Sequence, residues 1–325
     1  MKSVVEDIKK GSFKPVYLFY GEEAYLKQQY KNRLKNAVLP EGDTINLSIY
    51  SGKGIDVKEM IAQADTMPFF AEHRLLLIED SGFFKNANQQ LAEYIPSIPE
   101  ETIILFVESE VDKRGKLYKA VSKKGSVVEF TAQNEQTLTR WILGILKTEG
   151  KMITSGAMKQ FLEKTGTDME RIRQELEKLI CYCMEKESIT EEDVAVICSE
   201  QTENKIFDMI NAMAEKKQKK AMELYYDLLA LKEPPMRILY LITRQFNLLM
   251  QVKEISEEGY SAKTISERLK MAGFIVRNCL RQAEYFSLKT LKEALQDCVR
   301  MEEAVKTGRM NDVMSVELLL VKYSS

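Results

Sequence analysis

Short apolar runs without alternation are the feature that most constrains how this chain can fold, and the first 130 residues contain several of them. The runs end at turn residues such as Gly21 and Gly52, and they alternate with segments of helical spacing such as 24–38. Strands that are apolar on both faces are typical of a parallel sheet covered by helices on each side. The sequence therefore predicts a doubly wound α/β domain. Its five strands are expected at 15–20, 45–50, 74–80, 102–107 and 126–130.

The strand pattern stops near residue 135, and the remainder of the chain predicts helices. Thr190 and Asp193 have the spacing of a capping box, and Pro235 opens a long helical pattern that ends at Gly259. The low contents of glycine and proline, 15 and 7 of 325 residues, agree with a helix-rich chain. We expect three domains: an α/β domain at 1–135, a small helical domain at 136–204 and a larger helical domain at 205–325.

Composition argues against several classes of function. The chain has one histidine, His73, and its five cysteines include no CxxC pair, which argues against a metal site and a disulfide framework. The formal net charge of -2 provides no overall field that would attract nucleic acid or a membrane surface. The longest apolar runs are far shorter than a membrane span. We expect a cytoplasmic protein that needs neither a metal nor another cofactor.

The turn after the first strand is where an α/β domain usually binds a nucleotide. A phosphate-binding loop has the pattern G-x-x-x-x-G-K-[ST], in which backbone amides surround phosphate and the hydroxyl binds magnesium. Gly21 and Lys27 have this spacing, but Leu26 replaces the second glycine and Gln28 replaces the hydroxyl residue. The carboxylates of residues 22–23 would also repel phosphate. The sequence therefore predicts a degenerate loop that does not bind ATP.

Two adjacent aromatic residues form a candidate binding element. The segment Met67-Pro68-Phe69-Phe70 lies between a predicted helix and the third predicted strand. Neighbouring side chains in an extended segment point in opposite directions, so one or both rings can project as interface anchors. The alternative is that both rings pack beneath the sheet. The residues alone leave these two arrangements open.

A basic segment at 112–124 follows the fourth predicted strand. It contains six basic residues and one acidic residue, and its candidate DNA contacts are Lys113, Arg114, Lys116 and Lys119. Such a stripe can follow a phosphate backbone. The alternative is a solvated helix face with no ligand.

Together these motifs resemble one family, the delta subunit of the bacterial DNA polymerase III clamp loader. The resemblance extends over the whole chain and depends on the order and spacing of motifs that are individually weak. They are found at 15–23, 67–78, 168–179, 189–194, 235–239 and 306–308.

The resemblance implies an AAA+/RecA-like sheet domain without ATPase activity, followed by a lid domain and a C-terminal collar domain. It implies that Phe69 and Phe70, with Met67 and Pro68 beside them, bind the sliding clamp (beta) and open its ring. It also implies a hetero-pentamer with delta-prime and tau/gamma subunits, which would bind ATP and surround primer–template DNA at the replication fork in the nucleoid. The competing interpretations are an active AAA+ ATPase and a stand-alone DNA-binding scaffold.

Overall fold

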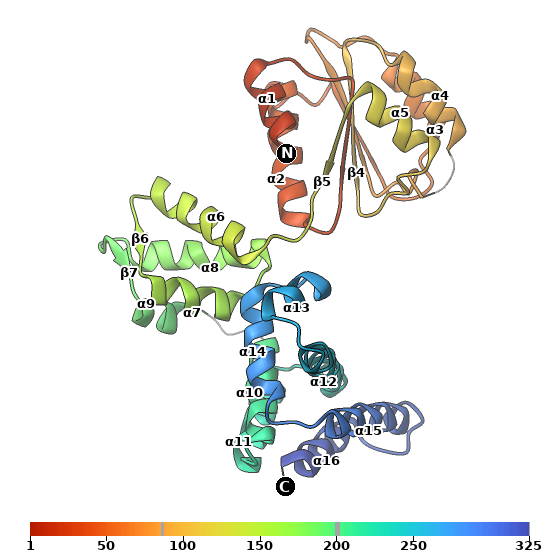
Figure 1. Cartoon of the computed structure of the whole chain (residues 1–325). Coiled ribbons are helices and arrows are strands. Elements are labelled where there is room, and N and C mark those ends of the chain that lie inside the picture. Colours follow the sequence, from red (N-terminus) through yellow and green to blue (C-terminus); the bar gives the residue numbers. More distant parts are fainter. Residues whose placement is uncertain (86–87, 199–201, 325) are drawn as a thin grey trace. The chain divides into compact units, whose positions relative to one another are not determined.

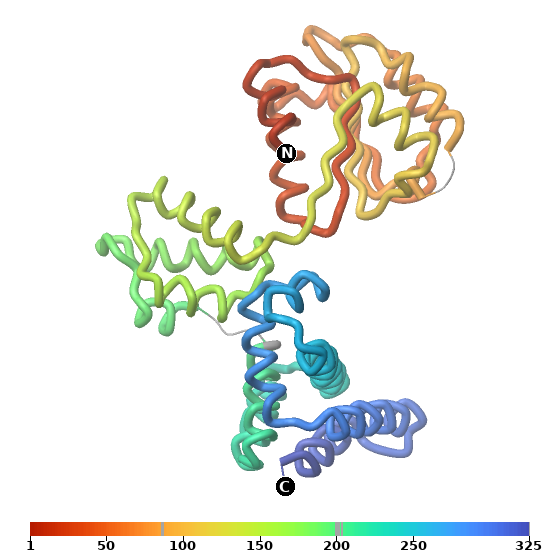
Figure 2. The backbone as a smooth tube through the Cα atoms, in the orientation of Figure 1, coloured from red at the N-terminus to blue at the C-terminus, as the bar shows by residue number. Residues whose placement is uncertain are grey.

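The computed structural model describes residues 1–85, 88–198 and 202–324 and divides the chain into two compact units, Met1–Gln133 and Asn134–Ser325. Figure 2 follows the backbone through both units. The predicted boundary between residues 135 and 136 lies two residues beyond this division. The predicted boundary between residues 204 and 205 falls inside the second unit, so the separation into lid and collar stays a prediction.

The first unit contains a five-stranded sheet in which every paired strand is parallel, in the order β2-β3-β4-β1-β5. This confirms the predicted fold class. The strands are β1 (Val16–Tyr20), β2 (Leu47–Ser51), β3 (Arg74–Glu79), β4 (Thr102–Glu108) and β5 (Ser126–Glu129). The second strand begins two residues later than predicted, because Ile45 and Asn46 belong to the preceding turn.

Helices cover both faces of this sheet, as Figure 1 shows for α1 and α2 on one side and α3, α4 and α5 on the other. Successive residues of β1 alternate between the two layers: Val16 and Leu18 join the core beneath α3, α4 and α5, while the Tyr17 hydroxyl donates to Asp7 of α1 at 2.9 Å. Burial on both faces explains the apolar runs. The helices are α1 (Lys2–Lys10), α2 (Ala24–Val38), α3 (Val57–Ala64), α4 (Gln89–Tyr94) and α5 (Lys116–Lys124), with a short 3₁₀ turn, η1 (Ile95–Ser97), after α4.

The second unit is mostly helical. Two short strands, β6 (Met152–Ile153) and β7 (Ser188–Ile189), pair in parallel, which corrects the expectation that strands end near residue 135. Two-residue strands are too short to leave a periodic signal. The helices are α6 (Glu135–Thr148), α7 (Ser155–Thr165), α8 (Met169–Tyr182), α9 (Glu191–Ile197), α10 (Thr202–Ala214), α11 (Gln218–Ala230), α12 (Pro235–Glu257), α13 (Ala262–Leu269), α14 (Gly273–Ala283), α15 (Leu288–Lys306) and α16 (Asp312–Ser324).

The cores and ends of these helices follow from local chemistry. Ser261 and Ser287 cap α13 and α15 by accepting the backbone N–H groups of Thr264 and Thr290. The apolar stripe of α12, including Ile242, Phe246 and Leu249, packs in one core shared with α10, α11, α14, α15 and α16.

Within the described residues, we find no helix with the length and apolarity needed to cross a bilayer.

The predicted capping box at the start of α9 is confirmed and is reinforced by an ion pair. Asp193 is 3% exposed, and its carboxylate accepts the Thr190 backbone N–H at 2.9 Å and the Lys186 ammonium at 2.5 Å. The hydrogen bond from Lys186, followed by that from the Thr190 N–H, lowers the pKa of Asp193 to about 2. A carboxyl whose pKa is lowered by folding stabilises the folded state above its unfolded pKa of about 3.9.

We predict that Asp193→Asn lowers the free energy of unfolding at pH 7 by about 1 kcal/mol, because the exposed Lys186 loses a partially screened partner. The difference from the parent protein should shrink as the pH falls from about 4 towards 2, since the Asp193 carboxylate is protonated first in the unfolded chain and then, at its lowered pKa of about 2, in the folded protein. Urea unfolding followed by the fluorescence of Trp141, the single tryptophan, measures this in the same unit.

Asp168→Asn is the matched control. Asp168 caps α8 through the Arg171 N–H, and asparagine caps a helix about as well as aspartate. A gap between Asp193→Asn and the parent that stays constant from pH 7 to pH 3 would contradict the ion-pair account.

Candidate functional site

A loop that joins α3 to β3 exposes three large apolar side chains. Because it precedes a strand, this aromatic loop (residues 66–71) lies at the amino-terminal edge of the parallel sheet. Met67 is 75% exposed, Phe69 58% and Phe70 96%, while Pro68 is half-buried. The rings of Phe69 and Phe70 contact each other edge to face, with centroids 4.6 Å apart. Of the two arrangements left open by the sequence, the structure has the one in which both rings project.

The backbone at Phe70 has an unusual conformation. Its φ is 50°, in the left-handed region where a side chain with a Cβ is disfavoured by about 1–2 kcal/mol. Such a conformation persists when neighbouring contacts fix it, and it is frequent at binding sites. The contacts that fix it here come from Asn46 and Arg74.

Asn46 holds the middle of the aromatic loop. Its side-chain Oδ1 accepts the Phe69 backbone N–H at 2.7 Å, and its Nδ2 donates to the Phe69 carbonyl at 3.0 Å. The same Nδ2 donates to Asp43 at 2.7 Å, and the whole residue is 2% exposed. The hydrogen bond from the Asn46 side chain lowers the pKa of the Asp43 carboxyl, and the backbone N–H groups of Asn46 and Ile45 lower it further. Asn46 therefore pairs with Phe69 much as a neighbouring strand would.

Arg74 holds the start of the loop from β3. The residue is 4% exposed, and its guanidinium donates from Nε to the Thr66 carbonyl at 3.0 Å and from Nη2 to the Met67 carbonyl at 3.4 Å. The roles of Asn46 and Arg74 were not predicted from the sequence. The available signals were the amide side chain of Asn46 within the predicted strand 45–50 and the cation of Arg74 at the start of the next predicted strand.

The degenerate phosphate loop lies at the opposite, carboxyl-terminal edge of the sheet. Gly21 has a φ of 120°, and a Cβ there would lie 2.2 Å from the Phe130 carbonyl oxygen. That carbonyl accepts the Glu23 backbone N–H at 3.1 Å. The tight turn after β1 therefore packs against the end of β5, and the Glu23 amide of this turn points to the Phe130 carbonyl instead of toward a phosphate.

Side chains of the chain itself fill the rest of this edge. The Lys27 ammonium, in a residue that is 9% exposed, donates to the Glu108 carbonyl at 3.1 Å, and burial lowers its pKa. The Glu108 carboxylate accepts the Ser81 N–H and hydroxyl, and burial raises its pKa. Leu26 is buried and Gln28 is exposed. The lysine that would reach a β- or γ-phosphate is thus already bonded.

The predicted basic residues divide into two pairs. Lys113 lies 2.9 Å from the Glu129 carboxylate and Arg114 lies 3.1 Å from Asp112, so these cations are partly neutralised. Lys116 and Lys119 are exposed and one helical turn apart on α5, which places them on one face. The structure therefore brings only the second pair together as an open basic face.

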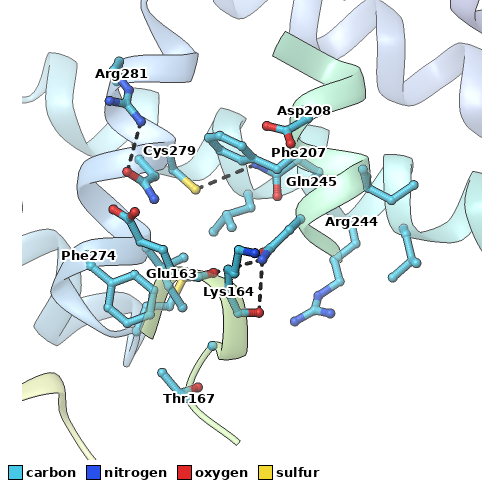
Figure 3. Close-up of a pocket in the computed structure, with 18 of the residues that line it drawn as sticks. Glu163, Lys164, Thr167, Phe207, Asp208, Arg244, Gln245, Phe274, Cys279 and Arg281 are labelled. Atoms are coloured by element: carbon cyan, nitrogen blue, oxygen red, sulfur yellow. Dashed lines mark hydrogen bonds between the residues drawn. The ribbon is translucent and has the colours of Figure 1, made fainter. Parts of the chain in front are cut away.

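A separate pocket of about 650 Å³ lies in the helical unit, among the end of α7, the start of α8 and helices α10, α12 and α14 (Figure 3). Asn204 donates to the Glu163 and Lys164 carbonyls at 2.9 and 3.2 Å, and Arg281 donates to Asn278 at 3.2 Å. Figure 3 draws the bond from the labelled Arg281 as a dashed line.

Comparisons with known proteins identify the family. Residues 17–131 match the model described as DNA polymerase III, delta subunit, and residues 203–323 match that described as DNA polymerase III delta subunit, C-terminal domain. DNA polymerase III subunit delta of Bacillus subtilis is 30% identical over 331 residues, covering 98% of this chain and 95% of the relative. A probable DNA polymerase III subunit delta of Aquifex aeolicus is 21% identical over 257 residues, covering 75% and 72%.

A solved structure gives the same result. The Bacillus subtilis DNA clamp loader delta protein has 30% sequence identity and a TM-score of 0.69, with 99% of each chain covered. The chain therefore belongs to the family of DNA polymerase III delta subunits, which confirms the resemblance read from its motifs.

Proposed function

We propose that this chain binds a ring-shaped sliding clamp through Met67, Pro68, Phe69 and Phe70 and holds one interface of the ring open. The observation that carries the proposal is the exposure of both phenylalanines on a loop whose backbone is fixed by buried side chains. Exposed aromatic residues are typical centres of protein interfaces. A fixed loop also loses less conformational entropy on binding than a flexible one. Family membership supplies the kind of partner.

Ring opening on this account is a shift of an existing equilibrium. An anchor of this size stabilises the open ring by the difference between its affinities for the open and closed states. Each tenfold difference in affinity shifts the equilibrium tenfold, or by about 1.4 kcal/mol. No chemical step on this chain is required.

ATP binding and hydrolysis would belong to other subunits of the assembly. On this proposal the chain joins delta-prime and tau/gamma subunits in a hetero-pentamer through residues 205–325, and the lid at 136–204 connects that collar to the sheet domain. The assembly would act at replication forks in the cytoplasm. Support for a non-hydrolysing chain comes from Lys27, whose ammonium bonds the Glu108 carbonyl.

A contact with primer–template DNA is a second element of the proposal. Lys116 and Lys119 present adjacent ammonium groups to solvent from α5. Exposed lysines on one face bind phosphates by releasing counterions, without reading the base sequence. Lys113 and Arg114 would contribute less because each has a carboxylate partner.

We predict that Phe69→Ala/Phe70→Ala weakens binding of the purified chain to its clamp by about 2–4 kcal/mol while leaving thermal unfolding unchanged, because two exposed anchor rings are removed. Titration calorimetry measures the affinity. Tyr240→Ala/Tyr285→Ala, which removes two exposed rings from the helical unit, is the matched control and should bind as the parent does. Equal clamp affinity for the parent and the double phenylalanine variant would disprove the assignment.

We predict that Leu26→Gly/Gln28→Thr neither binds nor hydrolyses ATP, although it restores the residue types of a phosphate loop. Lys27 stays bonded to the Glu108 carbonyl, and the Glu23 N–H stays bonded to Phe130. Equilibrium binding of a fluorescent ATP analogue and release of phosphate provide the two measurements. Saturable turnover by this variant or by the parent chain would favour the active ATPase.

We predict that Lys116→Ala/Lys119→Ala weakens binding of the assembled loader to primer–template DNA and reduces the slope of log affinity against log salt by about 2, one for each lost phosphate contact. Clamp affinity should not change. Lys219→Ala/Lys220→Ala, on α11, removes the same charge and serves as the control. An unchanged salt slope would leave α5 as a solvated face.

A further inference from the structure

Asn46 has every feature of a residue that shapes a binding element without touching the partner. It lies 23 positions before Phe69 in sequence, yet its side chain bonds both the N–H and the carbonyl of that residue. It is also almost completely buried, so a docked protein would not reach it.

The two hydrogen bonds fix two successive peptide planes. The Phe69 N–H belongs to the plane that follows Pro68, and the Phe69 carbonyl belongs to the plane that leads into Phe70. With the second plane held, the left-handed rotation at Phe70 determines where its ring projects and how it meets the ring of Phe69. Without Asn46, Phe70 can relax to an ordinary negative φ and swing its ring away.

Asn46 is itself held on its other sides. Asp43 accepts hydrogen bonds from the Asn46 Nδ2 at 2.7 Å and from the Asn46 backbone N–H at 3.0 Å. The Asn46 carbonyl accepts the Leu75 N–H of β3 at 2.8 Å. Both protons of the Nδ2 group are therefore engaged, one by Asp43 and one by Phe69. Asn46 therefore links the aromatic loop to the sheet, through Phe69 on one side and Leu75 on the other.

We propose that Asn46, held by Asp43, is the positioning residue that fixes Phe69 and Phe70 in the geometry that the sliding clamp recognises. This inference rests on the proposed clamp-binding function. Loss of the asparagine side chain should reduce affinity by freeing the loop, because a flexible anchor must be ordered when it binds.

The test compares clamp affinities of full-length variants by titration calorimetry or surface plasmon resonance. Asn46→Ala should bind the clamp at least tenfold more weakly than the parent, and amide hydrogen exchange at Phe69 should accelerate, because its N–H loses its acceptor. Asp43→Ala should weaken binding less, since it removes the acceptor of the Asn46 side chain and of two backbone N–H groups but leaves both hydrogen bonds between Asn46 and Phe69 in place. Asp43 is half-buried, so this second variant decides the question if Asn46→Ala does not fold.

Asn88→Ala is the matched control. It removes an asparagine side chain from the same unit, one that accepts the Leu91 N–H and caps α4. Its clamp affinity should equal that of the parent. In a Phe69→Ala/Phe70→Ala background, Asn46→Ala should cost less than threefold further, because a positioning residue acts through the rings that are already missing.

The outcomes distinguish failure of the role assigned to Asn46 from failure of the proposed clamp-binding function. Parental affinity in Asn46→Ala and Asp43→Ala, with binding lost in Phe69→Ala/Phe70→Ala, overturns the inference and leaves the proposed function intact. A tenfold loss that persists in the Phe69→Ala/Phe70→Ala background, or that Asn88→Ala shares, also overturns it, because it reflects general destabilisation. Parental affinity in Phe69→Ala/Phe70→Ala removes the proposed function itself.

Discussion

A parallel sheet whose central strands are buried on both faces offers a partner its ends rather than its faces, and this constraint organises the first unit of the protein. The central strands β1, β3 and β4 lie between two layers of helices, so nearly all their side chains are committed to packing. The amino-terminal end carries the aromatic loop, and the carboxyl-terminal end carries the turn after β1 that contains Gly21. The proposed clamp-binding loop and the turn where such a domain usually binds a nucleotide are therefore separated by the length of the strands.

The two ends use buried polar groups in opposite ways. At the carboxyl-terminal end, Lys27 donates to the Glu108 carbonyl and Ser81 donates to the Glu108 carboxylate. At the amino-terminal end, Asn46 and Arg74 bond the backbone of a loop and thereby expose its apolar side chains. Buried polar groups stabilise a structure only when they are paired, and here one set of pairs occupies the polar groups at a turn while the other holds an exposed loop.

Much of this was predictable from the sequence because the signals are local. Apolar runs located the strands, the bounds of α2 match its helical pattern, and Thr190 with Asp193 marked the start of α9. Paired phenylalanines beside a proline indicated a binding element. The left-handed φ of Phe70 and its fixation by Asn46 were not predictable, because they depend on a contact across 23 residues that no periodicity records. The ion pair of Lys113 with Glu129, 16 residues away, escaped prediction for the same reason.

The central claim is that the aromatic loop itself enters the clamp, and the most direct test is a photo-crosslink from the ring position of Phe70. A benzoylphenylalanine at this exposed site, in the assembled loader with ATP and clamp, should form a covalent adduct with the clamp. The same probe at Tyr285, exposed in the helical unit, should not. A loader that still places clamps on DNA while position 70 yields no clamp adduct would contradict the account.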